Sequence, residues 1–187
     1  MNVLLISDIH SNISALEAVV RDAKIKFEID EVWVLGDLVG YGPDPAACLD
    51  FLDSIDAVCV AGNHDHAVAG IITIEWFNPI AAAAVDWTAE SLDSTHLDQL
   101  KALPEVIERH GITLVHGSPR APMMEYVYSE LVAQDAINDT DTAGVAVGHT
   151  HLAAIYEQRE GLTRGILIDR SRPYSFAGVS FLVNPGS

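Results

Sequence analysis

Short apolar runs alternate with a helical pattern in the first half of the chain. Three runs rich in β-branched and apolar residues, 3–6, 31–35 and 57–61, are predicted to be strands. Between the first two runs, a capping box at Ser14 and Glu17 opens a stretch whose apolar residues recur at helical spacing. This order of strand, helix and strand predicts a βαβ unit with a parallel sheet.

Two further helix starts are marked by proline. Asp44-Pro45 and Asn78-Pro79 each place a capping side chain before a proline that suits the first helical turn. The second of these helices is expected to run to about Leu92.

The second half of the chain is predicted to be rich in strands. Runs at 106–110 and 112–116 flank His110-Gly111 and indicate a hairpin. Further antiparallel strands are expected at 153–157, 164–169 and 179–183. This division predicts two sheets packed face to face with helices outside, within a single domain over residues 1–187.

The balance of acidic and basic residues limits the classes of ligand that the protein can bind. Ten Lys and Arg residues against 27 Asp and Glu residues leave a formal net charge of −17. This field repels nucleic acid, so broad nucleic-acid binding is not expected. It also repels an anionic substrate, so a phosphate site here needs local positive charge, which bound metal cations would supply.

The start of the chain and its cysteines set expectations about location. The apolar first strand lacks a basic leader and meets Asp8 too early for a secretory signal. The apolar stretch 80–85 is far shorter than the roughly 20 residues that span a bilayer. Cys48 and Cys59 lack metal-site spacing and are expected to be buried free thiols. We expect a soluble, cytoplasmic protein without a membrane partner; a homo-oligomer is left open.

Histidine and acidic residues gather directly after predicted strands. The motifs are Asp8-x-His10, Gly36-Asp37, Gly62-Asn63-His64-Asp65, His116-Gly117 and Gly148-His149-x-His151. Because ligands of open α/β sheets collect beyond the carboxyl ends of strands, five such loops predict one shared site. Extended backbone is expected at both i, i+2 pairs, which would point Asp8 with His10, and His149 with His151, from one face.

The donors in these motifs are typical of a site for two divalent ions. Imidazole, carboxylate and amide groups without thiolates suit Mn, Fe, Zn or Ni, with Mn favoured, and argue against a structural zinc site of the Cys type. Seven donors are too many for one tetrahedral ion but suit two ions that share a carboxylate and a solvent molecule.

In this order the five motifs resemble the signature of the calcineurin-like metallophosphoesterases. Segments 41–45 and 116–120 also resemble a bacterial phosphodiesterase-like subgroup of that family. The resemblance implies an α/β fold, a four-layer α/β/β/α sandwich of two mixed sheets flanked by helices. It also implies that Asp8, His10 and His151 hold one ion, that Asn63, His116 and His149 hold the other, and that Asp37 bridges both.

The resemblance extends to the reaction. A hydroxide held between the two ions would attack the phosphorus in line. His64 would contact the phosphate and stabilise or protonate the leaving oxygen, and Asp65 would orient His64. Two other residues have two interpretations each: Asn12 binds substrate or caps a helix, and Arg120 binds a substrate phosphate or forms a surface salt bridge.

The expected function is therefore hydrolysis of a small phosphodiester by a metal-dependent enzyme. A phosphomonoesterase or protein phosphatase with the same site is the alternative. A non-catalytic scaffold of the same fold is a third reading, against which the filled ligand positions and His64 argue. Relatives of this type commonly continue beyond an Asn-Pro-Gly-Ser segment, whereas this chain stops at Ser187, so a truncated or a naturally short form is expected.

Overall fold

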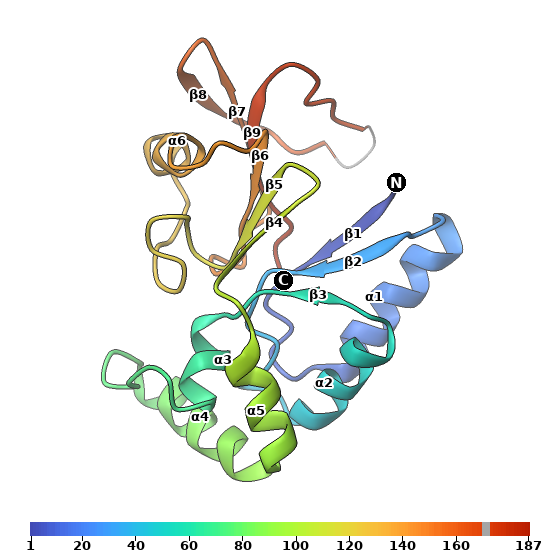
Figure 1. Cartoon of the computed structure of the whole chain (residues 1–187), viewed down its shortest axis with the longest axis vertical. Coiled ribbons are helices and arrows are strands. Elements are labelled where there is room, and N and C mark those ends of the chain that lie inside the picture. Colours follow the sequence, from blue (N-terminus) through green and yellow to red (C-terminus); the bar gives the residue numbers. More distant parts are fainter. Residues whose placement is uncertain (170–172) are drawn as a thin grey trace.

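Two β-sheets packed face to face form the centre of the molecule in the computed structural model, which describes residues 1–169 and 173–187 (Figure 1). Within these residues, the first sheet has three parallel strands in the order β1-β2-β3, which span Val3–Ile6, Glu31–Val34 and Val58–Cys59. The second sheet is mixed, with six strands in the order β4-β5-β6-β9-β7-β8. From β4 to β9 they span Val106–Arg109, Ile112–Val115, Gly144–Ala146, Ala154–Arg159, Leu162–Ile166 and Ser180–Asn184.

The helices begin where the sequence places its capping residues. They are α1 (Ile13–Lys26), α2 (Pro45–Ser54), α3 (Asn63–Val68), α4 (Pro79–Ser91), α5 (Ser94–Ala102) and α6 (Glu130–Asn138). Both predicted proline starts are confirmed, since α2 begins at Pro45 and α4 at Pro79. Asn78 caps α4 by accepting hydrogen bonds from two backbone amides of its first turn.

The start of α1 differs from the prediction. Asn12, not Ser14, is the N-cap, and its Oδ1 accepts a hydrogen bond from the Ala15 amide at 3.1 Å. The chain turns at Ser11, which has a φ of +57°, and this turn puts Asn12 at the cap position one residue before Ile13. Helix capping is therefore the observed role of Asn12.

Most predicted strands are present, but one pairing was wrong. The β4–β5 hairpin turns at His110-Gly111, both with positive φ. However, β9 is antiparallel only to β7 and pairs in parallel with β6, which is itself parallel to β5. The reason is helix α6, which carries the chain across the sheet between β5 and β6 and makes a second βαβ crossover that the sequence pattern did not reveal.

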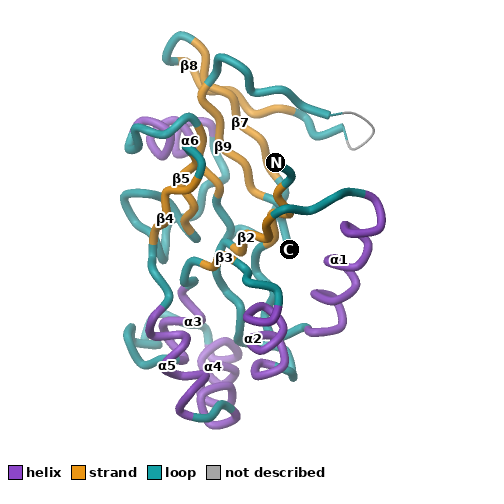
Figure 2. Tube along the Cα trace, turned by 45° about the vertical axis from the view of Figure 1, so that its right-hand side comes forward, coloured by secondary structure: helices purple, strands orange, loops and turns teal. Residues whose placement is uncertain are grey.

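Alternation along the strands builds four layers. In β1, Leu4 and Ile6 pack with the helical core of α1 and α2, whereas Val3 and Leu5 face the second sheet and pack with Trp33. A third core joins the outer face of the second sheet to α6. Figure 2 shows α6 at the upper left beside the second sheet, α1 at the right beside the first sheet, and α2 to α5 below the strands. The predicted α/β/β/α fold is confirmed.

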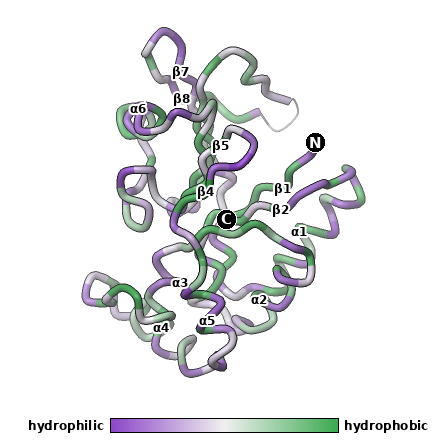
Figure 3. The backbone as a smooth tube through the Cα atoms, viewed as in Figure 1, coloured by the Kyte–Doolittle hydropathy of each residue, from purple (hydrophilic) through white to green (hydrophobic). Residues whose placement is uncertain are grey.

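Hydropathy along the chain follows these layers. Hydrophobic stretches run along β1 and β3 of the first sheet, and the tip of the β4–β5 hairpin is hydrophilic (Figure 3). Among the described residues, no helix has both the length and the apolar character needed to cross a bilayer.

Candidate metal centre

The predicted donor residues meet where strands of both sheets end. Asp8 follows β1, Asp37 follows β2 and Asn63 opens α3 after β3, while His116 follows β5. His149 and His151 lie in the loop after β6. Two groups have their donor atoms within 4.8 Å of one another: Asp8, His10 and His151; and Asp37, His116 and His149. A ring nitrogen of His64 lies within the same distance of the donor atoms of His10 and Asp37.

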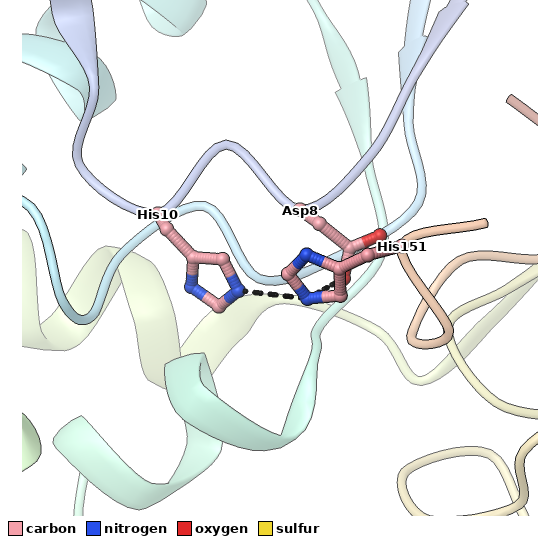
Figure 4. Close-up of side chains that lie close together, drawn as sticks. All are labelled: Asp8, His10 and His151. Atoms are coloured by element: carbon pink, nitrogen blue, oxygen red, sulfur yellow. Dashed lines mark hydrogen bonds and ion pairs between the residues drawn. The ribbon is translucent and has the colours of Figure 1, made fainter. Parts of the chain in front are cut away.

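The first group is more exposed than the second, since His151 is exposed and His10 half-buried. Figure 4 shows its three side chains close together. The Nε2 atoms of His10 and His151 are 3.3 Å apart, and His151 Nε2 is 3.4 Å from Asp8 Oδ1. His10 Nδ1 donates to the carbonyl oxygen of Val39 at 3.1 Å, and His151 Nδ1 is 3.1 Å from the Ser187 hydroxyl. In a neutral His10 ring the lone pair is therefore on Nε2 and faces its partners.

The second group is buried. His116 Nδ1 donates to the carbonyl oxygen of Leu35 at 2.7 Å, which fixes the tautomer of the neutral ring. Its Nε2 lies 3.1 Å from Asn63 Oδ1 and 3.0 Å from His149 Nδ1. The free electron pairs of three side chains thus point at one small region.

Asp37 lies between the two groups. Its Oδ2 is 3.6 Å from His10 Nε2 on one side and 3.4 Å from His116 Nε2 on the other. Its Oδ1 accepts a hydrogen bond from the His64 amide at 2.9 Å. One carboxylate oxygen therefore faces both groups while the other holds the loop that follows β3.

These residues fit a pair of divalent cations. Among the described residues, three buried atoms of the site have no hydrogen-bond partner: both carboxylate oxygens of Asp8 and Nε2 of His149. Leaving such atoms without partners costs roughly 1–3 kcal/mol each, more for a charged group. Because Asp8 belongs to the first group, that group contains buried acceptor atoms that a cation would satisfy. In the second group, a cation would bind the atoms of Asn63, His116 and His149 that face one another.

The pKa shifts within the cluster also favour a bound cation. Burial lowers the pKa of His149 to about 4 and raises the pKa of Asp8 above its usual range. Burial also tends to lower the pKa of His116, but the neighbouring Asp37 and Asp8 outweigh it and raise that pKa to about 9. Without a cation, protonation of His116 would place positive charge beside Asp37. A divalent ion would supply that charge instead and favour neutral imidazole.

The backbone at the paired ligands is not extended, so that part of the sequence argument was wrong. Asp8 and His10 have φ of +55° and +47°, and His149 and His151 have φ of +64° and +59°. Each pair lies in a tight turn beyond its strand, where left-handed residues redirect both side chains toward the cluster. Such conformations are costly for residues other than glycine and concentrate at functional sites.

Close contact between loops explains two of the motif glycines. A Cβ atom on Gly36, which has a φ of +86°, would lie 2.7 Å from the Gly62 amide nitrogen and 2.8 Å from His116 Nδ1. A Cβ atom on Gly62 would lie 2.1 Å from Asp37 Oδ1. Only residues without a side chain allow Asp37 and Asn63 to approach one another across the ends of β2 and β3.

His64 lies in a cavity of about 310 Å³ beside the cluster, which Asp37, Asn63 and His149 also line. Its ring stacks on Phe77 with centroids 5.0 Å apart. Its Nδ1 is buried against Gly40 and has no hydrogen-bond partner among the described residues.

Asp65 does not orient His64 directly, in contrast to the prediction. Its two carboxylate oxygens accept hydrogen bonds from the amides of Val39, at 3.0 Å, and Gly62, at 2.8 Å. Among the described residues, no hydrogen bond joins either oxygen to the His64 ring, whose Nδ1 has no partner. Asp65 instead connects the loop after β2 to the first turn of α3. The His64 ring, which belongs to that turn, packs against the loop at Gly40.

The two predicted substrate contacts are placed differently. Asn12 lies beside Asp8 and His10 in a larger pocket of about 810 Å³, although its side-chain oxygen caps α1. Arg120 forms surface salt bridges, which is the second of its two predicted interpretations. Its guanidinium donates to Glu125 and Asp135, and it lines neither pocket beside the metal centre. Two nearby carboxylates therefore compete for it before any substrate does.

Asn184 is a residue of the site that the sequence argument missed. Its buried side-chain amide donates to the carbonyl oxygen of Gly148 at 2.7 Å and to Thr150 Oγ1 at 3.0 Å. These bonds fix the loop that carries His149 and His151. The turn-forming Asn-Pro-Gly-Ser segment after the last strand was the available signal.

Comparisons with known proteins agree with this site. The profile of the calcineurin-like phosphoesterase family matches residues 1–153. An uncharacterized protein of Methanocaldococcus jannaschii is 33% identical over 190 residues, which cover 99% of this chain and 75% of that protein. The crystal structure of a metallophosphoesterase from Sphaerobacter thermophilus is similar with a TM-score of 0.84 and 36% identity, covering 100% of this chain and 76% of that one.

A shorter similarity is found to a nucleotide hydrolase. The symmetrical bis(5′-nucleosyl)-tetraphosphatase of Pseudomonas entomophila is 31% identical over 121 residues, which cover 60% of this chain and 41% of that protein. The family match, in contrast, covers all the motifs from Asp8 to His151. The chain belongs to the calcineurin-like phosphoesterase family and is a metal-dependent phosphoric ester hydrolase.

Proposed function

We propose that this protein hydrolyses a small phosphodiester at a centre of two divalent ions. The observation that carries the proposal is Asp37 Oδ2, which faces His10 on one side and His116 on the other at distances under 4 Å. A carboxylate in this position suits a ligand shared by two ions.

The ligand assignment follows from the two groups. Asp8, His10 and His151 are proposed to hold one ion, Asn63, His116 and His149 the other, and Asp37 both. Backbone carbonyls fix the His10 and His116 rings with Nε2 toward the cluster, as hydrogen bonds to metal-binding histidines do elsewhere. Imidazole and carboxylate without thiolate favour Mn, Fe, Zn or Ni, and we propose Mn first.

The reaction needs a nucleophile, charge neutralisation and a leaving-group contact. When bound, the two ions lower the pKa of water and neutralise charge on the phosphoryl oxygens. A solvent oxygen attacks phosphorus in line, the bond to the leaving alkoxide breaks, and the alkoxide takes up a proton. His64 lies in the cavity with Nδ1 buried, which leaves Nε2 as the ring nitrogen for the leaving oxygen.

The charge around the site favours a diester over a monoester. No Lys or Arg is among the described residues that line either pocket beside the metal centre, and the chain carries a net charge of −17. A phosphodiester has one negative charge, whereas a monoester carries about −1.5 to −2 at neutral pH. The similarity to a symmetrical bis(5′-nucleosyl)-tetraphosphatase supports only a substrate that carries organic groups at both ends.

Two broader expectations remain part of the proposal. A single domain is supported by the core between the sheets, where Val3 near the start packs in the same cluster as Val183 near the end. A cytoplasmic location is supported by the free thiols of Cys48 and Cys59.

The test is turnover of bis-p-nitrophenyl phosphate against p-nitrophenyl phosphate by the Mn²⁺-loaded protein. The proposal predicts a higher kcat/KM for the diester, and loss of both activities after treatment with a chelator. Cleavage of the monoester alone would contradict the diester assignment while leaving the metal centre intact.

A further inference from the structure

Aromatic side chains form the walls of the cavity beside the metal centre. Tyr41, Trp76, Phe77 and Tyr126 line it together with His64 and the metal-binding candidates. Large apolar side chains are usually withdrawn from water, yet 81% of Trp76 is exposed. Exposed aromatic groups that meet at a concave site with polar ligands mark a surface that binds something flat and apolar.

Three of these rings already have partners within the protein. Phe77 stacks on His64, Tyr41 lies against the same ring with centroids 4.7 Å apart, and Tyr126 stacks on His149 at 3.9 Å. Trp76 has no ring partner among the described residues. The Trp76 indole is therefore available to stack on a ligand.

The backbone on both sides of Trp76 is held in place. The Phe77 amide donates to the carbonyl oxygen of Ile74 at 2.9 Å, and Asn78 caps helix α4. Phe77, which follows Trp76 directly, packs on His64. Because the backbone next to Trp76 is held, only its side-chain rotation has to be fixed when a planar group binds, which limits the loss of conformational entropy.

The position of Trp76 indicates which part of a substrate it meets. The proposed function places His64 at the leaving oxygen, and Trp76 adjoins His64 through Phe77. The described lining of the cavity contains no Lys or Arg, so it offers the leaving group aromatic surface and no charge for additional phosphates. A leaving alcohol with a neutral planar ring fits this wall better than a polyphosphate.

We propose that Trp76 is a specificity-determining residue that stacks on a planar aromatic group, a nucleobase or an aryl ring, carried by the leaving alcohol of the phosphodiester. The inference rests on the proposed function. It adds that substrates with such a ring are selected over diesters with two aliphatic groups.

The first experiment compares two diesters across matched variants. Trp76→Ala, Trp76→Phe and the control Trp87→Ala are assayed with bis-p-nitrophenyl phosphate and with glycerophosphocholine, followed by release of p-nitrophenol and by phosphorus NMR. Trp87 is a suitable control because it is also an exposed tryptophan, on α4, but does not line the cavity.

Stacking energies predict the size of the effect. Trp76→Ala should lower kcat/KM for the aryl diester about tenfold, mainly through KM, and leave the aliphatic diester unchanged. Trp76→Phe should restore most of the loss, and Trp87→Ala should match the wild type. An equal loss on both diesters, or no loss on either, would overturn the proposal.

A binding measurement separates this proposal from the proposed function. Adenosine and phenol, which lack phosphate, are titrated into the whole protein while tryptophan fluorescence is recorded. Quenching by either compound in the wild type and in Trp87→Phe, but not in Trp76→Phe, is the expected result, and the stronger quencher identifies nucleobase or aryl preference. Quenching without any diester turnover would reject the proposed activity but keep the aromatic site; quenching that persists in Trp76→Phe would reject Trp76 as the stacking residue.

Discussion

The Nε2 atom of His116 lies 3.1 Å from the side-chain oxygen of Asn63, while Nδ1 of the same ring donates to the carbonyl oxygen of Leu35. In a neutral ring, Nε2 and the Asn63 oxygen are both hydrogen-bond acceptors. Two acceptors in contact repel unless positive charge lies between or beside them. A proton on His116, whose pKa Asp37 and Asp8 raise, or a metal ion would supply this charge. We propose that a metal ion does so in the active enzyme.

His64 is expected to act in the reaction without holding a metal. Its replacement by alanine should leave both ions in place and lower kcat about 10²- to 10⁴-fold, as loss of a proton donor or hydrogen bond at the leaving oxygen does. The measurement is kcat on bis-p-nitrophenyl phosphate together with metal content.

The matched control for His64 is His110→Asn on the β4–β5 turn, where asparagine tolerates the φ of +51°. It should retain wild-type kcat. Full activity in His64→Ala with bound metal would remove His64 from the mechanism.

Asn184 should stabilise the metal centre by holding the loop that carries two of its histidines. Replacing it with alanine removes both donors that hold the loop of His149 and His151, so metal affinity should fall about 10- to 100-fold. The free energy of unfolding should fall by about 1–3 kcal/mol, because two hydrogen bonds worth about 0.5–1.5 kcal/mol each are lost, while the Thr150 amide still donates to the Gly148 carbonyl oxygen.

Metal titration and denaturant unfolding of Asn184→Ala test this role. Asn138→Ala is the control, because Asn138 is exposed and its side chain bonds only to Gln158 among the described residues. Equal metal affinity in both variants would show that the loop does not need Asn184.

Arg120 is expected to be dispensable for substrate binding. Its guanidinium is bound by Glu125 and Asp135, and its side chain lies 43% exposed at the surface. Arg120→Ala should keep KM for the diester within about twofold of wild type and change stability little, because surface salt bridges contribute little. A large rise in KM with unchanged kcat would restore the substrate-phosphate role.

The two cysteines should react slowly in the folded protein. Burial raises the pKa of Cys48 and of Cys59 to about 12, and the nearby Asp44 and Asp65 act in the same direction. Both thiols are therefore protonated at neutral pH, although Cys59 is only partly buried. A disulfide reagent should titrate them rapidly only after denaturation. Fast reaction of a thiol in the native protein would contradict this environment.

Local signals predicted those parts of the fold that depend on a few neighbouring residues. Asp44-Pro45 and Asn78-Pro79 marked true helix starts, and His110-Gly111 marked a true hairpin turn. The parallel pairing of β6 with β5 and β9 depends on a crossover between residues far apart in the chain, so no local pattern reveals it.

The same limit applies to the candidate site. Each motif named residues that the structure brings together, because loops after neighbouring strands share one edge of the sheets. The conformations that do so are left-handed turns at Asp8 and His149, which residue spacing alone does not distinguish from extended backbone. The partners of Asp65 and Arg120 were missed because they come from other segments, Val39 and Asp135.

The most direct test of the account is the number of ions bound per chain. Metal is removed with a chelator, and Mn²⁺ is titrated back into the wild type and Asp37→Ala while heat and bound metal are measured. We predict two ions per wild-type chain, and loss of at least one in Asp37→Ala because Asp37 faces both groups. A wild-type chain that binds no ion, or an Asp37→Ala variant that binds two as tightly as the wild type, would contradict the shared centre.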